Sequence, residues 1–297
     1  MNSKDRLHYK HVHSGGTAYY QQSRGLVSVR GSEAVQFLDG LISNEVKNLE
    51  DGAQMLAAFP DAKGRLIAVV RVTRHAEQFL FETEEATRQK VFDNLFRFTM
   101  AGDFFVEDLS ATYRFVRVFD RSFIPITTPF VEFDMPYGTD YFVHEEDAFD
   151  FVSELKYRDP AEISDDLFET LRIELGIPLY GVDMDETTIV PEIGLDGLIS
   201  YTKGCYIGQE IIARIHFRGH VAKKLTGICA PEETRLEKSA KLETADGKNA
   251  GWITSVTISP KLKKAIGLAY VRYDYLEGGT KLLMAGSDVE VAGLPFV

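Results

Sequence analysis

The stretch from Tyr201 to Leu225 contains the residues whose types and spacing could do chemistry. It reads YTKGCYIGQEIIARIHFRGHVAKKL and holds Cys205, one of two cysteines in the 297-residue chain. Isoleucines at 207, 211, 212 and 215 recur on one face of a helix, and Gly219 fits a C-terminal stop. We therefore expect a helix here, with Cys205 just before its first turn.

This placement would make Cys205 a reactive nucleophile. Backbone N–H groups at the start of a helix favour negative charge, and Lys203 adds a positive charge nearby. Both features would favour the thiolate form of the cysteine. The alternative is that Cys205 is a small packed hydrophobe, as many free cysteines are. The sequence leaves both interpretations open.

The same stretch is basic, although the whole protein is acidic. Its basic residues are Lys203, Arg214, Arg218, Lys223 and Lys224, against the single acid Glu210, which gives a net charge of +4 in a chain of net charge −12. A local cationic patch on an acidic protein predicts a specific anion site rather than a general affinity for polyanions. The alternative is that the arginines form a solvated helix face.

Composition excludes several classes of protein. With 44% hydrophobic and 26% charged residues the chain is typical of a globular protein, and its length allows two or three domains. The acidic balance argues against broad nucleic-acid binding. No cysteine or histidine spacing is typical of zinc or iron–sulfur ligands, so no metal site is expected. No signal core or apolar run of about 20 residues is present, so we expect no membrane span and a cytoplasmic location.

The elements that must position these residues follow from periodicity and turn signals. Strands are expected at 26–29, 54–59, 66–73, 78–82 and 113–119, and helices after Ser32, Thr83 and Ser164. Arg172 and Glu174 lie off the apolar stripe of the last helix, so the sequence alone favours solvated side chains. The polar N-terminus, with His8, His11 and His13, is expected to be lightly packed, with a metal-binding tract as the alternative.

Two further regions complete the prediction. Residues 180–200 lack periodicity, and a loop of this length in a compact domain is usually functional. After Lys224, short β-rich segments separated by glycine-containing turns predict a small closed or nearly closed barrel, with Cys229 as a structural residue in one strand. The rest alternates strands and helices in hairpin-like order, which favours antiparallel α+β layers. The glycine-rich loops lack nucleotide-binding spacing.

One motif carries a family resemblance. Residues 203–210, KGCYIGQE, resemble the K-G-C-[YF]-x-G-Q-E signature of the YgfZ family, which are folate-binding relatives of the glycine-cleavage T-protein (aminomethyltransferase). Besides Lys203 and Cys205, the signature positions are Gly204, Tyr206, Gly208, Gln209 and Glu210. The match continues at 213–214 and 218–219, extends back to 172–178 and 191–195, and is looser over 37–46.

The resemblance implies a fold. The family is a ring of three domains: two interleaved antiparallel α+β domains followed by a small C-terminal β-barrel, with folate in the central hole. Mapped onto this chain, residues 1–50 together with 140–222 would form the first, folate-binding domain. Residues 51–139 would form the second domain, and residues 223–297 the barrel.

The resemblance also implies a tetrahydrofolate-binding accessory protein that supports assembly or repair of iron–sulfur enzymes, with those proteins or a redox partner as its partners. The cofactor would be tetrahydrofolate or a one-carbon derivative. Glu192 would accept the adjacent N–H donors of the pterin ring, although a surface glutamate with no role is the alternative. Lys203, Arg214 and Arg218 would meet the glutamate carboxylates, Arg172 is a further cofactor-binding candidate, and Cys205 is the tentative catalytic residue.

One departure leaves open whether the chain is an enzyme. The T-protein carries a catalytic aspartate in a G-x-x-x-D-D stretch, and the comparable run here is GRLIAVV at 64–70, with Ala68 and Val69 in place of carboxylates. An alternative function is a folate-dependent aminomethyltransferase or demethylase that uses Asp61 or Asp183 instead. A further alternative is a tRNA-modification factor, which the basic helix alone supports.

Overall fold

The computed structural model describes residues 1–120 and 122–297, which divide into two compact units. Unit 1 comprises Met1–Phe59, Ala68–Phe168 and Gly197–Tyr206, and unit 2 comprises Pro60–Ile67, Glu169–Asp196 and Ile207–Val297. The chain passes between the units several times, so neither unit is one continuous segment. The three domain boundaries predicted from the sequence stay a prediction.

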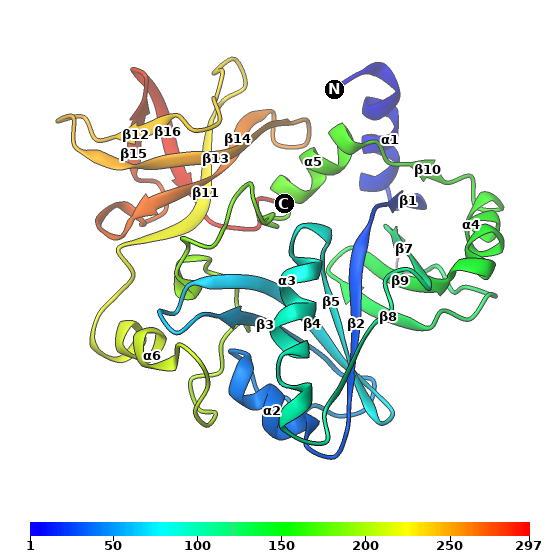
Figure 1. The fold of residues 1–297 in the computed structure, drawn as a ribbon. Coiled ribbons are helices and arrows are strands. Elements are labelled where there is room, and N and C mark those ends of the chain that lie inside the picture. The colour runs from blue at the N-terminus through cyan, green and yellow to red at the C-terminus, as the bar shows by residue number, and fades with distance from the viewer. Residues whose placement is uncertain (121) are drawn as a thin grey trace. The chain divides into compact units, whose positions relative to one another are not determined.

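Unit 1 is built on two five-stranded sheets whose strands are interleaved in the sequence (Figure 1). The β2 sheet has the order β3-β4-β5-β2-β6, with β3 at Gln54–Pro60, β4 at Leu66–His75, β5 at Gln78–Glu84, β2 at Arg24–Arg30 and β6 at Phe105–Asp108. The β7 sheet has the order β10-β1-β7-β9-β8, with β10 at Ala161–Glu162, β1 at Ala18–Gln21, β7 at Tyr113–Val118, β9 at Gly138–His144 and β8 at Val131–Met135. β1 and β10 run parallel, whereas β2 pairs antiparallel with β5 and β6, β4 with β5, β7 with β1 and β9, and β8 with β9, as predicted for antiparallel layers.

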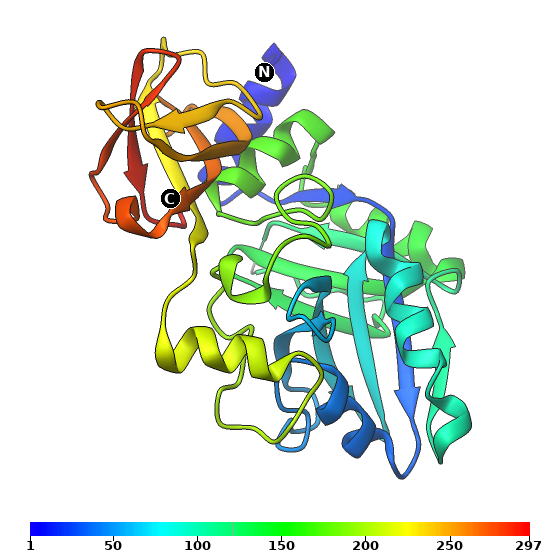
Figure 2. The same ribbon diagram turned by 60° about the vertical axis from the view of Figure 1, so that its left-hand side comes forward.

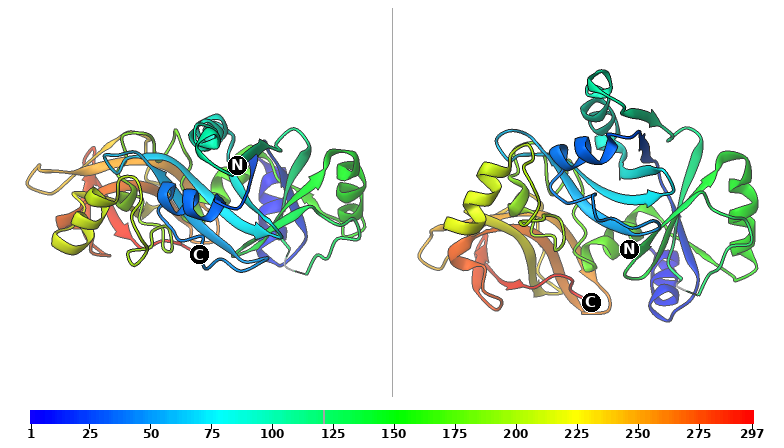
Figure 3. Two further views of the ribbon diagram at one scale, coloured as in Figure 1. Left: turned by 60° about the horizontal axis from the view of Figure 1, so that its bottom comes forward. Right: turned by 90° about the horizontal axis from the view of Figure 1, so that it is seen from below.

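Apolar side chains hold these layers together. Leu26 and Leu80 of the β2 sheet form one buried cluster with Phe115, Phe133 and Phe142 of the β7 sheet. Helix α3 (Glu85–Phe96) packs across β2, β5 and β6, which Figure 3 shows from two further directions. Helix α2 (Ala34–Leu41) buries Leu38 and Leu41, and α4 (Ala148–Lys156) packs on β9 through Phe151 and Leu155.

The N-terminus forms a helix that the sequence did not predict, and its packing is light, as expected, because Asp5 and Tyr9 are its buried residues. Helix α1 (Ser3–His13) begins at Asn2, whose side chain accepts a hydrogen bond from the Asp5 backbone N–H at 2.8 Å. Tyr9 is buried, and the buried Asp5 carboxylate accepts from Ser164 Oγ at 2.7 Å. The predicted metal-binding alternative finds no support, because the described residues contain no group of three metal-ligating side chains.

Unit 2 contains the predicted C-terminal barrel. Six antiparallel strands close in the order β11-β14-β13-β12-β15-β16, seen from a second side in Figure 2. Their bounds are β11 Lys223–Pro231, β12 Lys241–Glu243, β13 Asn249–Ser259, β14 Lys264–Arg272, β15 Lys281–Met284 and β16 Ser287–Ala292. Inward-facing aliphatic residues such as Ile228, Ile253 and Val271 fill the barrel. The sequence missed only the short β12, and Cys229 is buried in β11 as expected.

Two helices carry candidate site residues. Helix α5 (Asp165–Glu174) starts where Ser164 Oγ accepts from the Leu167 N–H at 3.2 Å, and the chain turns away at Gly176, whose φ is +68°. Helix α6 (Gln209–Arg218) ends at Gly219 as predicted. Among the described residues, no helix is long and apolar enough to cross a membrane.

Candidate functional site

Lys203 ties the motif loop to another segment of unit 1. Its side chain is almost fully buried, and Nζ donates to the carbonyl oxygens of Ile42 at 2.9 Å and Asn44 at 2.6 Å. Burial lowers the pKa of the Lys203 ammonium to about 8, against an opposing effect of Asp39, whose Oδ1 lies 3.8 Å from Nζ. Lys203 therefore acts here as a clamp on the backbone rather than as a free cation.

Further contacts strengthen the same attachment. Ser43 Oγ donates to the Leu198 carbonyl at 2.6 Å, and Asn44 Nδ2 donates to the Gly197 carbonyl at 2.7 Å. The Lys203 ammonium also lies 5.2 Å from the ring centre of Tyr206, which is buried. Burial, aided by Tyr201, raises the pKa of the Tyr206 phenol to about 12. The loop that carries Cys205 is thus attached to residues 42–44 through Lys203 and through the carbonyls of Gly197 and Leu198.

Cys205 itself is exposed, so its interpretation as a packed hydrophobe was wrong. Gly204 beside it is exposed as well, which leaves the thiol accessible to solutes. The expected position just before the first helical turn was also wrong, because α6 begins only at Gln209, with Gly208 as its N-cap. The reactivity of the thiol stays a prediction.

The remaining motif residues shape the start of α6. Gly208 has a φ of +80°, and a Cβ there would lie 2.4 Å from the Asp61 carbonyl oxygen, so only glycine fits. Asp61 in turn accepts from the backbone N–H groups of Lys63 and Arg65 at 2.7 and 2.9 Å. The Asp61 carboxylate therefore stabilises the tight turn at residues 61–65. Gln209 is half-buried and Glu210 is exposed.

Glu192 lies in unit 2 on the single-turn helix η3 (Val190–Glu192). The segment before it pairs with the turn ahead of β4, because the Leu66 N–H donates to the Thr188 carbonyl at 2.8 Å and the Val190 N–H donates to the Gly64 carbonyl at 3.0 Å. These bonds fix the backbone from which the Glu192 side chain projects. The side chain is 4% exposed, so the alternative of a surface glutamate with no role was wrong.

The Glu192 carboxylate has a cation on both of its oxygens. Lys223 Nζ donates to Oε1 at 2.9 Å and to Oε2 at 2.8 Å. The same ammonium lies 5.6 Å from the Trp252 ring centre and 5.5 Å from the Tyr270 ring centre. We call Glu192, Lys223, Trp252 and Tyr270 the Glu192 cluster. It combines a bidentate acceptor, a displaceable cation and two aromatic rings.

Tyr270 contributes a second feature to the Glu192 cluster. Its hydroxyl is buried and has no well-formed hydrogen bond within the described residues, although the Thr188 side chain lies close enough to interact with it. Burial raises the pKa of this phenol, and the Glu192 and Asp183 carboxylates add to the rise, against the opposing contact with Thr188. A buried hydroxyl with so weak a partner is able to take up a ligand or water. Sequence reasoning missed Lys223, Trp252 and Tyr270 as a group, although Trp252 is the sole tryptophan of the chain.

Arg172 and Glu174 are buried, so the expectation of solvated side chains was wrong for both. Arg172 Nη1 donates to Asp183 Oδ2 at 2.7 Å, and Nη2 donates to Ser255 Oγ at 2.6 Å. Glu174 accepts from Ser259 Oγ at 2.5 Å. These bonds link α5 to β13 of the barrel. The Arg172 guanidinium is thus committed to protein acceptors, and its contact with a cofactor stays a prediction.

Arg214 and Arg218 lie on α6 with exposed side chains. Neither makes a hydrogen bond or an ion pair with any residue that the structure describes. In the ligand-free protein the two arginines therefore form a solvated helix face. Their contact with a folate carboxylate stays a prediction.

The run predicted to correspond to the T-protein aspartate stretch leads into β4 and carries no carboxylate. Ala68 is fully buried in β4, and Val69 is half-buried beside it. The proposed substitute Asp183 is saturated: it accepts from Arg172, the Leu179 N–H, Thr254 and Ser255. A carboxylate with all its acceptor positions filled is poorly placed to orient a substrate amine. Asp183 is therefore poorly placed to act as a general base, whereas the two backbone bonds to Asp61 occupy Oδ1 alone.

Comparisons with known proteins agree with this geometry. Residues 223–297 match the family of glycine cleavage T-protein C-terminal barrel domains. The crystal structure of glycine cleavage system aminomethyltransferase T from Bartonella henselae has the same fold, with a TM-score of 0.84 over 98% of this chain and 89% of that one, at 19% sequence identity. The aminomethyltransferase of Rubrobacter xylanophilus is 27% identical over 302 residues, which covers 92% of this chain and 80% of the relative.

Fold and barrel together define the class: the chain has the T-protein fold and is a relative of the aminomethyltransferases. A tRNA-modifying protein YgfZ from Hamiltonella defensa is 27% identical over 226 residues, covering 68% of this chain and 66% of that protein. Together with the barrel and the aminomethyltransferase relatives, this match supports a YgfZ-like relative of the glycine-cleavage T-protein, as the sequence predicted.

Proposed function

We propose that the chain is a tetrahydrofolate-binding accessory protein that supports assembly or repair of iron–sulfur enzymes. The observation that carries the folate part is the buried Glu192 carboxylate, whose two oxygens already accept together from one cation. A pterin ring presents two adjacent N–H donors, which can take the same two acceptor positions as Lys223. The similarity to aminomethyltransferases supports this choice of ligand.

The residues of the Glu192 cluster fit a reduced pteridine. Glu192 would accept from the ring, the Trp252 and Tyr270 rings would contact its faces or edges, and the weakly bonded Tyr270 hydroxyl would gain a further acceptor or donor. Bound tetrahydrofolate would supply or accept a one-carbon unit. Arg214 and Arg218 are exposed cations able to meet its glutamate carboxylates. Lys203 is less suited, because its ammonium is buried against backbone carbonyls.

Cys205 is the residue we propose for contact with a protein partner. Its exposed thiol stands on a loop that Lys203 holds in place, so it can reach an iron–sulfur protein or a redox partner without rearrangement of unit 1. Growth under oxidative stress with Cys205→Ala tests this role. Growth equal to that of the wild type would remove Cys205 from the proposal and leave folate binding untouched.

Calorimetry with tetrahydrofolate tests the ligand. We expect wild-type protein to bind and Glu192→Gln to bind at least roughly tenfold more weakly, because one charge-assisted bidentate contact is worth more than 1.4 kcal/mol. Glu233→Gln, which changes an exposed glutamate of the same unit, is the matched control and should bind as the wild type does. Equal binding by wild type and Glu192→Gln would refute the pterin assignment.

A second candidate is a folate-dependent aminomethyltransferase or demethylase. The aminomethyltransferase relatives, which match over most of the chain, favour it. The engaged carboxylate of Asp183 and the buried Ala68 disfavour it. Turnover of an N-methyl or aminomethyl substrate with tetrahydrofolate bound would support catalysis, and no turnover across such a panel would exclude it.

A third candidate is a tRNA-modification factor, which the name of the YgfZ relative favours. Exposed Arg214 and Arg218 would contact phosphates, so binding to tRNA should fall steeply with salt and weaken in Arg214→Ala and Arg218→Ala. Weak binding that ignores both substitutions would exclude this function.

A further inference from the structure

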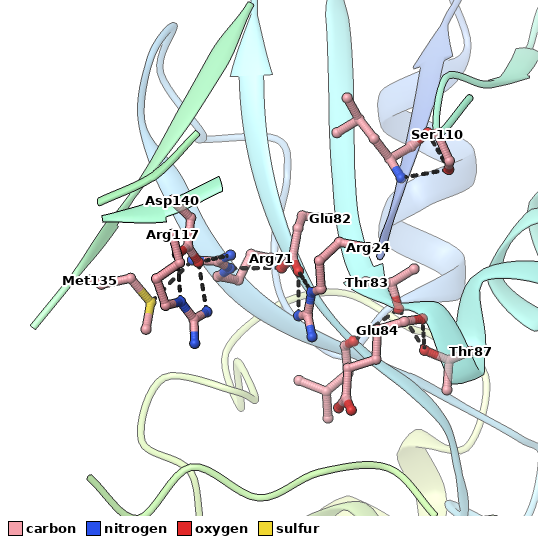
Figure 4. A network of polar contacts seen from close by, with 12 residues as sticks. Arg24, Arg71, Glu82, Thr83, Glu84, Thr87, Ser110, Arg117, Met135 and Asp140 are labelled. Atoms are coloured by element: carbon pink, nitrogen blue, oxygen red, sulfur yellow. Dashed lines mark hydrogen bonds and ion pairs between the residues drawn. The ribbon is translucent and has the colours of Figure 1, made fainter. Parts of the chain in front are cut away.

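Two buried carboxylates of this chain are paired in different ways. In unit 1, Asp140 accepts from Arg117 at 2.6 and 2.8 Å and from Arg71 at 2.5 Å, so two planar guanidinium groups hold it (Figure 4). In unit 2, the single ammonium of Lys223 meets both oxygens of Glu192. The first arrangement joins strands of two sheets, whereas the second depends on one compact cation whose flexible stem can shift.

The Glu192 carboxylate can accept a ligand without losing Lys223. An ionised carboxylate offers roughly four acceptor positions, two on each oxygen. On Oε2 one position accepts from the Ile189 backbone N–H at 3.3 Å and the other from Lys223. On Oε1 Lys223 is the only donor among the described residues, so one position is open. If two ligand donors took the positions that Lys223 now fills, the ammonium could still move to the open position on Oε1.

Charge keeps the ammonium beside the carboxylate when a neutral ligand binds. The Glu192 side chain is only 4% exposed, and a pterin ring carries no net charge near neutral pH that could replace the ammonium. Departure of Lys223 into water would leave the carboxylate buried and unbalanced, which is costly. The rings of Trp252 and Tyr270, 5.6 and 5.5 Å from Nζ, also favour a cation here. We therefore expect Lys223 to stay on Oε1 in the complex.

An ammonium on Oε1 fixes how a pterin can lie. The ring presents N3–H beside a 2-amino N–H, and its 4-oxo oxygen is the neighbour of N3 on the other side. With N3–H on Oε1 and the 2-amino group on Oε2, the ammonium faces the 4-oxo oxygen, which is an acceptor. With the two donors exchanged, the ammonium would face the second N–H of the 2-amino group, which is a donor. The first orientation is therefore favoured.

We propose that Lys223 determines specificity at this site: it selects 2-amino-4-oxo pteridines by donating to the 4-oxo oxygen while it remains on Glu192 Oε1. The proposal rests on the proposed folate function and adds the third group of the ring that the protein recognises. Glu192 alone would accept any pair of adjacent N–H donors. A 2,4-diaminopteridine places a donor against the ammonium and is protonated more readily, so Lys223 repels it.

Calorimetry with tetrahydrofolate and with its 4-amino analogue, tetrahydroaminopterin, tests the proposal, because the two ligands differ only at position 4 of the ring. We expect the wild type to bind tetrahydrofolate at least roughly tenfold more tightly than the analogue. In Lys223→Met the ratio of the two Kd values should fall to roughly one or invert. The ratio is taken within one variant, so a loss of structure that weakens both ligands equally does not change it.

Three further variants complete the experiment. Lys223→Arg retains the charge and the donors and should keep the preference for tetrahydrofolate. Lys223→Gln replaces the methionine variant if that variant fails to fold, and it should also lose the preference, because its neutral amide can donate to a 4-oxo group or accept from a 4-amino group. Lys241→Met changes an exposed lysine of the same barrel and is the matched control, with the wild-type ratio expected.

The outcomes separate this proposal from the folate proposal. If the wild type binds tetrahydrofolate through Glu192 but Lys223→Met keeps the same ratio, Lys223 does not set specificity and the folate site stands. Equal affinity of the wild type for both ligands would also overturn the role of Lys223. A wild type that does not bind tetrahydrofolate, or binds it as tightly as Glu192→Gln does, would refute the folate site and this proposal with it.

Discussion

The Lys223 ammonium neutralises the charge of the Glu192 carboxylate in the ligand-free protein. Its ammonium contacts both carboxylate oxygens, and the Glu192 side chain is only 4% exposed. Removing the cation leaves a buried negative charge without its partner. We therefore expect Lys223→Met to lower the free energy of unfolding by about 1–3 kcal/mol, measured by urea denaturation.

The double variant Glu192→Gln/Lys223→Met separates this effect from lost packing. With the carboxylate gone there is no charge left unbalanced, so the double variant should be more stable than Lys223→Met alone. Lys223 also contacts two aromatic rings, and that contribution is lost in both variants. If the single and double variants were equally destabilised, packing rather than charge pairing would explain the effect of Lys223.

Individual roles were the hardest feature to predict from sequence. The family resemblance identified Glu192 and Cys205 as candidate site residues. The sequence could not show that Lys223 forms an ion pair with Glu192, or that Cys205 is exposed. It predicted Arg172 as solvated because the residue lies off the apolar stripe of α5. The side chain is buried instead because its acceptors, Asp183 and Ser255, come from distant segments. Pairing between distant residues leaves no periodic signal.

At the scale of elements, local patterns predicted most of what the structure shows. Short β-rich segments separated by glycine-containing turns predicted the barrel, and a serine cap with a glycine stop predicted α5. Helix α1 was missed because its sequence is strongly polar and its packing rests on only a few side chains, Tyr9 and Asp5 among them. Its cap, Asn2, was the one local signal that could have identified it.

The loop that carries Cys205 should respond to pH through Lys203. The pKa of this lysine is about 8 in the folded chain against an ordinary value of 10.5, so between these values the unfolded chain binds more protons. The contribution of Lys203 to the free energy of unfolding therefore rises as the pH increases from about 8 to 10.5. Below pH 8, the cost of burying the Lys203 ammonium is fully present. We expect the stability of the wild type relative to Lys203→Met to rise by roughly 1 kcal/mol between pH 7.5 and pH 9.5.

Urea denaturation of both proteins at the two pH values measures this difference, since groups that titrate equally in both cancel. Lys47→Met removes an exposed lysine of unit 1 and serves as the control, for which the difference should stay flat. A wild-type advantage that shrinks with rising pH would show that the ammonium form stabilises the clamp, contrary to its burial against backbone carbonyls.

At the scale of the whole molecule, the barrel that matches the T-protein C-terminal domain packs against other segments of unit 2. Ile173 of α5 is fully buried in a cluster with Leu225, Ile266 and Leu268 of the barrel strands. Asp183 accepts hydrogen bonds from Thr254 and Ser255, both buried on β13. Residues 223–297 alone would expose this apolar surface and remove the Asp183 acceptor, although Thr254 would keep its bond to the Leu268 carbonyl. The unit that folds therefore extends beyond the segment that the family comparison delimits.

We accordingly expect the fragment 223–297 to melt at least roughly 10 °C below the barrel in the full chain, because a few kcal/mol correspond to such a shift in a domain of this size. Circular dichroism melts of the fragment, with hydrogen exchange of β13 amides in the full chain as the reference, measure the difference. In the full chain Thr254→Val/Ser255→Ala should destabilise, because Asp183 and Arg172 lose their partners, whereas in the fragment the same pair should have a smaller effect, because only the Thr254 bond to the Leu268 carbonyl remains to be lost. A fragment as stable as the intact barrel, and indifferent to this pair of substitutions, would show that the barrel core alone determines its folding.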